Sequence, residues 1–275
     1  MVLIEPSSLP APLRRYLWRG AFELLPRHMP RADWTCMNYG HADVQAVGPL
    51  RSDQEPERAC LALYAHILGG QDVVGRRIVE VGSGRGGGLA WVHARGALRS
   101  VGVDFSRTAV QWCREHHSAP GLAFVWGEAE ALPLPDASAD LVLDVESSHC
   151  YGDLGRYCEE VARVLAPGGH FLLADFRDAD GVSDLVAAVA AAGLEIWRFE
   201  DVTADVVAAL EADRARRAQW FEAAHVGWLR GALARVSAVP GTAMHRAFVR
   251  GSTRYVVVGA TRPRASGPST AVEGP

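Results

Sequence analysis

The chain has 275 residues, of which 49% are hydrophobic and 22% are charged, and its formal net charge is −4. That hydrophobic fraction permits a sizeable core, whereas the acidic balance provides no basic footprint for nucleic acid or an anionic membrane. No apolar run approaches the ~18 residues of a membrane span, and the N-terminus lacks the pattern of an export signal. We therefore expect a cytoplasmic protein, monomer or homodimer, that binds neither nucleic acid nor membrane.

Residues 1–70 are expected to form an N-terminal helical arm. An amphipathic helix is predicted at residues 13–22, an aromatic turn-like segment at 34–41, and a second helix at 57–68 that ends before Gly69. The arm either packs on the surface or closes as a flap over a ligand. In the second case Asn38 and Tyr39 are the expected contacts, and the sequence leaves both alternatives open.

Residues 71–202 are expected to form the core, because strands and helices alternate regularly there. Such alternation indicates a doubly wound, mainly parallel sheet with helices on both faces, and ligands bind at the carboxyl ends of its strands. Strands are predicted at residues 77–81, 99–104, 122–126, 140–146, 170–176 and 194–199, and helices at 86–95, 106–117, 154–165 and 182–192.

The remaining segments complete a Rossmann-like α/β fold with seven strands. Residues 203–245 read as a helical insert, the expected lid, with one or two long helices over 203–238. Residues 246–262 carry the last strand of the core, and residues 263–275 have too little apolar surface to order themselves. The five cysteines are scattered without C-x-x-C spacing, so neither a disulfide framework nor a metal site is expected.

A glycine-rich loop follows the first core strand and marks the ligand site. Gly82, Gly84 and Gly87 satisfy G-x-G-x-x-G, a pattern that allows a tight turn and close ligand approach but fits several nucleotide cofactors. Glu80, two residues earlier, would repel the pyrophosphate of a dinucleotide. The sulfonium and ammonium of S-adenosyl-L-methionine (SAM) would instead attract it, by roughly 4 kcal/mol at about 4 Å and an effective dielectric near 20. The acidic site therefore favours SAM.

Five motifs in a fixed order carry a resemblance to a known family. The chain resembles the class I SAM-dependent methyltransferases, of the small-molecule branch found in bacterial natural-product and lipid pathways. The resemblance covers roughly residues 70–200 and implies SAM as the cofactor. The matching motifs lie at residues 80–87, 101–106, 127–135, 140–151 and 163–169.

The resemblance also implies which residues hold the cofactor. The loop of Gly82, Ser83 and Gly84 would lie along the methionine, Asp104 would accept hydrogen bonds from the ribose diol, and Glu128 would face the adenine amino group. Family members usually carry Asp at the position of Glu128, so its reach is longer here. The other implied contacts are Glu80, Phe105 against the adenine, Ser106, the Ala129 amide, Glu130, the Val145 carbonyl and Tyr39.

Catalysis is expected at the end of the fourth core strand. His149 is the candidate general base, and Asp175, near the end of the next strand, would orient it. A Glu-Ser-x-His turn followed by such an Asp is similar to sugar and polyketide O-methyltransferases. The alternative is a structural histidine that caps the loop. Glu146 is a second candidate, since similar sterol-type C-methyltransferases use a carboxylate here to stabilise a carbocation; otherwise it supports SAM or the loop.

The resulting interpretation is a SAM-dependent O-methyltransferase. Its acceptor would be a hydroxyl of a small-molecule secondary metabolite, namely a sugar, a polyketide or a lipid-like compound. Two alternatives remain open. One is N- or C-methylation of a similar scaffold, and the other is a SAM-binding cyclase or homologue that does not methylate.

Overall fold

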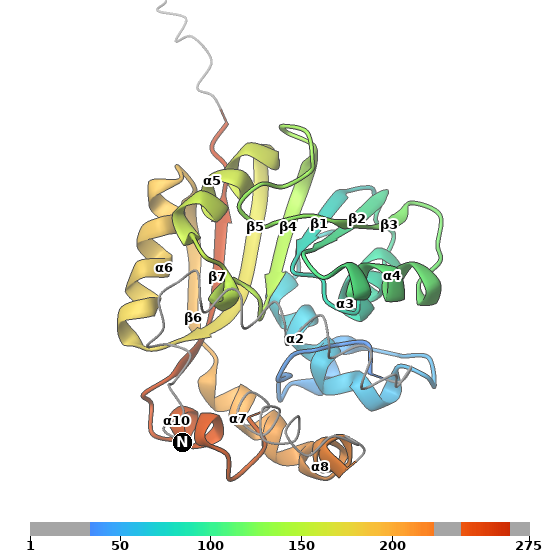
Figure 1. Cartoon of the computed structure of the whole chain (residues 1–275), viewed down its shortest axis with the longest axis vertical. Coiled ribbons are helices and arrows are strands. Elements are labelled where there is room, and N and C mark those ends of the chain that lie inside the picture. The colour runs from blue at the N-terminus through green and yellow to red at the C-terminus, as the bar shows by residue number, and fades with distance from the viewer. Residues whose placement is uncertain (1–33, 223–237, 265–275) are drawn as a thin grey trace, which may run out of the picture.

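The computed structural model describes residues 34–222 and 238–264, and its centre is one twisted sheet (Figure 1). The strand order is β3-β2-β1-β4-β5-β7-β6, and β7 runs antiparallel to both of its neighbours. The expected seven-stranded, mainly parallel Rossmann-like sheet is therefore confirmed. The strands are β1 (Arg77–Val81), β2 (Arg99–Asp104), β3 (Leu122–Trp126), β4 (Ala139–Val145), β5 (Leu165–Arg177), β6 (Glu195–Asp201) and β7 (Arg254–Thr261).

Helices cover both faces of the sheet, and each face has its own apolar core. Ile78 and Leu141 point into the core beneath α2, α3 and α4, whereas their neighbours Val79 and Val142 point into the core beneath α5 and α6. This alternation follows from the two-residue period of a strand. The helices are α2 (Arg58–Leu68), α3 (Gly87–His93), α4 (Arg107–His116), α5 (Leu154–Val164) and α6 (Ala179–Ala191).

Strand β5 is longer than the sequence predicted, because it begins at Leu165 instead of residue 170. Ala139 of β4 pairs with Leu165 of β5, and the next pair is Leu141 with His170. The extra residues of β5 between these two pairs form a bulge. Proline and glycine fit a bulge without breaking the strand. The bulge is held by the chain beyond β7, since Gly168 donates to the Arg262 carbonyl at 2.8 Å. This long-range pairing is invisible to local sequence patterns.

Helix α6 also begins earlier than expected, at Ala179 instead of residue 182. The side chain of Asp178 accepts a hydrogen bond from the Gly181 amide at 2.8 Å and thereby caps the first turn. The added turn contains Gly181, a residue of low helix propensity. The helix therefore starts where Asp178 caps it, and this residue is not part of the apolar sequence pattern used to predict the helix.

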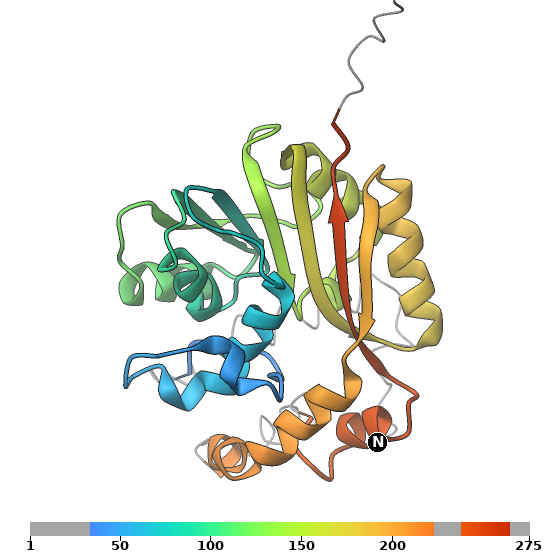
Figure 2. The ribbon, with the colours of Figure 1, turned by 180° about the vertical axis from the view of Figure 1, so that it is seen from behind.

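The arm and the insert gather beyond the carboxyl ends of the parallel strands (Figures 1 and 2). The described part of the arm contains α2 and two short 3-10 helices, η2 (Val44–Val47) and η3 (Glu55–Glu57). The insert contributes α7 (Thr203–Ala212), α8 (Arg214–Glu222) and α10 (Ala243–Val249); α10 runs past the expected boundary at residue 245, and β7 begins only at Arg254. The helix expected at residues 13–22 and the tail from residue 265 lie outside the described residues. None of the described helices is long and apolar enough to cross a membrane.

Candidate active site

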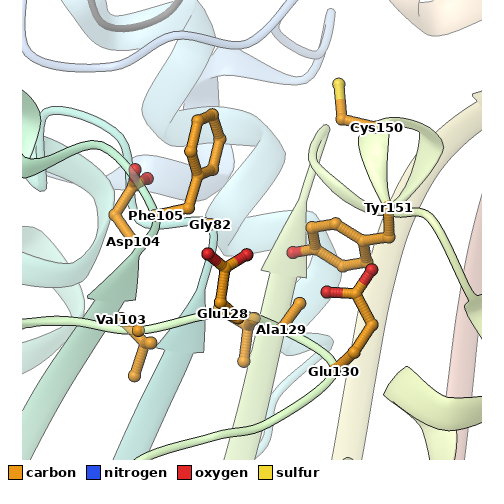
Figure 3. Close-up of a pocket in the computed structure, with 11 residues that line it drawn as sticks. Gly82, Val103, Asp104, Phe105, Glu128, Ala129, Glu130, Cys150 and Tyr151 are labelled. Atoms are coloured by element: carbon orange, nitrogen blue, oxygen red, sulfur yellow. The ribbon is translucent and has the colours of Figure 1, made fainter. Parts of the chain in front are cut away.

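A cavity with about 440 Å³ of empty space opens at the carboxyl ends of β1 and β2 (Figure 3). Three of the lining residues are acidic and none of the residues lining this described cavity is basic. The lining is Val81, Gly82, Val103, Asp104, Phe105, Gly127, Glu128, Ala129, Glu130, Cys150 and Tyr151.

Asp104 ends β2 at the edge of this cavity and holds two loops in place. One carboxylate oxygen accepts a hydrogen bond from the Gly84 amide at 2.8 Å, and the other accepts from the Ser106 amide at 2.8 Å. Each carboxylate oxygen can accept a further bond. Asp104 is thus suited to accept hydrogen bonds from a diol while it orders the glycine-rich loop.

Glu128, Ala129 and Glu130 also line the cavity, from the segment after β3 (Figure 3). The side chains of Asp104 and Glu128 are drawn on the same side of the site. Glu130 has a structural task, because one of its oxygens accepts from the Gly152 amide at 2.8 Å and from the Asp153 amide at 3.3 Å. It therefore anchors the loop that carries Tyr151 into the cavity.

Gly82 needs to be glycine for two reasons. Its φ is 69°, in the left-handed region, and a Cβ atom there would overlap the side chain of Ser147. The turn after β4 therefore lies directly against the start of the glycine-rich loop. Ser83 is buried, and its hydroxyl lies beside Gly102 of β2 and has no hydrogen-bond partner among the described residues.

Glu80 is buried between β1 and α2 and does not line the cavity. One carboxylate oxygen accepts from the Tyr64 hydroxyl at 2.6 Å, whereas Oε2 has no hydrogen-bond partner among the described residues. Burial raises the pKa of Glu80, the Tyr64 hydroxyl opposes this, and the carboxylates of Asp144 and Asp104 add to it; together they bring the pKa to about 8. Glu80 can therefore serve as an internal acid that a nearby cation would ionise.

Ser106 and Val145, also predicted to contact the cofactor, lie outside the cavity lining, as do Ser83 and Gly84 of the glycine-rich loop. Ser106 accepts from the Ala109 amide at 3.1 Å and caps α4. Val145 is the last residue of β4 and is buried. Helix capping accounts for Ser106 fully, so a cofactor contact by this side chain stays a prediction.

The arm crosses the glycine-rich loop and reaches the end of β4. The Gly87 amide donates to the Thr35 carbonyl at 3.1 Å, and the Tyr39 amide donates to Glu146 at 2.6 Å. Asn38 instead turns toward α2, where it donates to the Cys60 carbonyl at 3.2 Å. Neither Asn38 nor Tyr39 lines the cavity, but the segment lies over the loops that do.

His149 and Asp175 are in direct contact, which is the geometry that their sequence positions suggested. His149 belongs to η4 (Ser148–Cys150), after β4, and its Nδ1 lies 2.8 Å from Oδ1 of Asp175 on β5. Asp175 is completely buried, and 15% of the His149 side chain is exposed. Burial alone would lower the pKa of His149, but Cys150 and Asp175 outweigh it and hold that pKa well above its usual value. The next residue, Cys150, lines the cavity.

Glu146 adopts a strained backbone at the end of β4. Its φ of 54° is unusual for a residue with a side chain and costs of the order of 1–3 kcal/mol. The carboxylate accepts from the Tyr39 amide and from the Tyr255 hydroxyl at 2.9 Å. Burial raises its pKa to about 7 against the effect of these two donors. The strain directs Glu146 away from the cavity and toward the arm and β7.

A buried Asp144 network was not assigned from the sequence. Asp144 on β4 accepts from the hydroxyls of Ser147 at 2.8 Å, Tyr151 at 3.0 Å and Tyr157 at 2.7 Å. Burial and the Asp175 carboxylate raise its pKa to about 6, while the hydroxyl groups oppose them. The available signal was that Asp144 and Tyr151 share the motif at residues 140–151.

An aromatic cluster beside His149 was also missed. The rings of Tyr39 and Phe176 stack at 5.5 Å, and the Phe176 ring lies 4.3 Å from that of His149. Phe248 of α10 and Tyr255 of β7 close the cluster, at 5.8 and 6.4 Å from the Tyr39 ring. Its rings come from four separate segments of the chain, so no local sequence pattern predicts it.

The sheet order and the cavity at the glycine-rich loop agree with the fold expected of a SAM-dependent methyltransferase. A sequence model of the methyltransferase domain family matches residues 79–173. The chain belongs to the class I SAM-dependent methyltransferases, and its cofactor is S-adenosyl-L-methionine.

Mycobacterial lipid enzymes are among its relatives. The chain is 34% identical over 197 residues to the probable phthiotriol/phenolphthiotriol dimycocerosates methyltransferase 2 of Mycobacterium ulcerans (strain Agy99), which covers 71% of this chain and 76% of that one. It is 36% identical over 187 residues to a fatty-acid O-methyltransferase of Mycolicibacterium smegmatis, covering 67% and 68% of the two chains.

Solved structures share the fold at lower sequence identity. The [4+2]-cyclase SpnF superposes with a TM-score of 0.64 at 21% identity, covering 91% of this chain and 96% of SpnF. The geranyl diphosphate C-methyltransferase of Streptomyces coelicolor A3(2), crystallised with S-adenosyl-L-homocysteine, superposes with a TM-score of 0.65 at 18% identity and covers 93% and 98%.

Proposed function

We propose that this methyltransferase is an O-methyltransferase with a hydroxyl acceptor on a lipid-like small molecule. The observation that carries the proposal is the 2.8 Å contact between His149 and Asp175. This pair lies at the end of β4, one residue from the cavity lining at Cys150. A hydroxyl is a poor nucleophile until it loses its proton, so its methylation needs a base at this place.

The residues around the cavity fit the cofactor. The acidic lining without a basic residue suits a ligand with cationic groups, and the unpartnered Oε2 of Glu80 suits an ammonium group nearby. We assign Asp104 to the ribose diol, Phe105 to the adenine face, Glu128 and Ala129 to the adenine edge, and the loop from Gly82 to Gly84 to the methionine. When bound, SAM supplies a methyl group activated by its sulfonium.

His149 would remove the proton from the acceptor hydroxyl. Because Nδ1 is bonded to Asp175, the ring atom that takes up the proton is Nε2. Asp175 fixes the orientation of the ring and stabilises the imidazolium that forms. Well-placed bases contribute ~10² to 10⁴ in rate.

The lipid character of the acceptor rests on relatives and on the surroundings of His149. Two relatives are named for phthiotriol dimycocerosates and for fatty acids. Phe176, the one partly exposed member of the aromatic cluster, supplies apolar surface beside His149, and the buried rings of Tyr39, Phe248 and Tyr255 support it. A sugar or polyketide hydroxyl belongs to the same chemical class and should be included in the acceptor panel.

Replacing His149 with Ala tests the proposal. We expect S-adenosyl-L-homocysteine formation with hydroxylated lipids to fall at least about 100-fold, with the affinity for SAM unchanged. The wild-type rate should rise with pH through a point well above 6.5, since a base works only when unprotonated and the pKa of His149 is raised. Unchanged turnover in His149→Ala would contradict the proposal.

C-methylation is a second candidate, because Glu146 hydrogen-bonds to two members of the aromatic cluster, Tyr39 and Tyr255. A carboxylate held close to aromatic rings can stabilise a carbocation that forms during methyl transfer to carbon. For that chemistry Glu146→Gln should abolish transfer to an alkene acceptor, whereas His149→Ala should retain it. The two variants therefore separate the two reactions.

A further inference from the structure

Arg177, the last residue of β5, lies behind the His149–Asp175 pair. Only 12% of its side chain is exposed. Its Nη1 lies 3.0 Å from Oδ2 of Asp175, and its Nη2 donates to the Ser148 hydroxyl at 2.8 Å. That hydroxyl in turn donates to the same Oδ2 at 2.6 Å. Arg177 and Ser148 therefore hold one oxygen of Asp175, while His149 Nδ1 holds the other.

Asp175 depends on this compensation because its carboxylate is completely buried. Burial alone would raise the pKa of Asp175, but His149 and Arg177 together hold it well below the usual value. When His149 is neutral, one of these two positive charges is lost. A guanidinium stays charged at every working pH, so Arg177 still balances the buried anion.

Without Arg177, the His149–Asp175 pair would hold the proton of the His149 imidazolium more tightly. A buried carboxylate that lacks a counter-charge is costly, and protonation of His149 would then be its main compensation. Arg177 also repels the imidazolium. Both effects favour the neutral imidazole when the arginine is present.

We propose that Arg177 is a positioning residue that keeps Asp175 ionised and fixed, so that His149 can be neutral and act as the base. This inference rests on the proposed function of His149. Arg177 acts through Asp175 and is assigned no contact with the acceptor. The Ser148 hydroxyl hydrogen-bonds to both Arg177 and Asp175 and contributes to the same positioning role.

Other ionisable groups surround the pair and set the background against which Arg177 acts. Burial has raised the pKa of the carboxyl groups and tyrosines among them. A variant at position 177 leaves all of them in place. They are Asp144 and Glu146 from β4 and its turn, Cys150 from η4, Tyr39 from the arm and Tyr255 from β7.

The test is a direct titration of His149 by NMR in the full-length chain labelled in its histidine rings. The His149→Gln variant identifies the signal, and no acceptor is needed. We expect Arg177→Met to move the His149 midpoint upward by about one pH unit, and Arg177→Lys to restore most of the wild-type value. Arg156→Met, which removes an exposed arginine of α5 paired with Glu159, should leave the midpoint unchanged.

An unshifted midpoint in a folded Arg177→Met variant would overturn the inference. If that variant does not fold, Ser148→Ala carries the test, because it removes the hydroxyl between Arg177 and Asp175 and should give a smaller upward shift. Failure of the proposed function looks different. In that case the midpoint shifts as expected, but His149→Ala still transfers methyl groups at the wild-type rate.

Discussion

The strand ends of this molecule form two unlike halves. At β1 to β3 an open cavity of about 440 Å³ is lined by short loops, and its acids Asp104 and Glu128 lie at the edge of that space. At β4, β5 and β7 the chain is densely packed, and Asp144 and Asp175 are completely buried. The first half is built to receive a ligand, whereas the second holds ionisable groups whose protonation the protein itself controls.

The largest expected effect is on SAM binding, because the open half depends on the single carboxylate of Asp104. Asp104→Ala removes both the expected ribose contact and the two amide bonds that order the glycine-rich loop. We expect the affinity for SAM, measured by calorimetry, to fall at least about 100-fold, since each hydrogen bond to a charged group is worth roughly 1.5–3 kcal/mol. Asp53→Ala, at an exposed ion pair in the arm, is the matched control. Retained affinity would remove Asp104 from the site.

A smaller effect is expected from Glu80, whose titration makes the stability of the fold depend on pH. Its pKa is about 8 in the folded chain against roughly 4.3 in an unfolded one. The folded state therefore holds the proton more tightly, and the associated stability is present below about pH 4.3 and is lost as the pH rises through about 8. Glu80→Gln should flatten this decline in Tm between pH 5 and pH 8, whereas Glu159→Gln on the exposed face of α5 should not. Parallel wild-type and Glu80→Gln curves would show that Glu80 is ionised throughout.

The smallest effect concerns Ser106, which distinguishes a helix cap from a cofactor contact. Ser106→Ala should lower the free energy of unfolding by about 1 kcal/mol through loss of the α4 cap. The affinity for SAM should change less than about two-fold, because the side chain lies outside the cavity lining. Denaturant unfolding and calorimetry measure the two quantities, and a large loss of affinity with unchanged stability would restore Ser106 as a contact.

These two halves were also unequally predictable from the sequence. Asp104, Glu128 and the glycines of the loop occur in short motifs that follow strands, so their convergence at one edge follows from strand order alone. His149 and Asp175 were paired by the same reasoning. Arg177 and Tyr255 gave no such signal, because their partners depend on side-chain direction and on β7. The Tyr255 hydroxyl reaches Glu146 from 109 residues away in the chain.

Two predicted cofactor contacts in the open half lie outside the cavity lining for physical reasons as well. Glu80 is close in sequence to the glycine-rich loop, but strand alternation turns its side chain to the face covered by α2, where Tyr64 binds it. Ser106 follows Asp104 by two residues, yet helix α4 needs a cap at that position. Proximity in sequence to the glycine-rich loop therefore does not by itself place a side chain in the cavity lining.

The antiparallel β7 also has a consequence for how this chain can be altered. Asp201, the last residue of β6, is the register partner of Val256 near the start of β7. The insert therefore departs from and rejoins the sheet at adjacent points, and its two attachment sites are fixed by the sheet itself. Closing a flexible loop of doubled length costs only about 0.6 kcal/mol more. Segments of different length can consequently be grafted between Asp201 and Arg254 while the two attachment strands and the cofactor half keep their places.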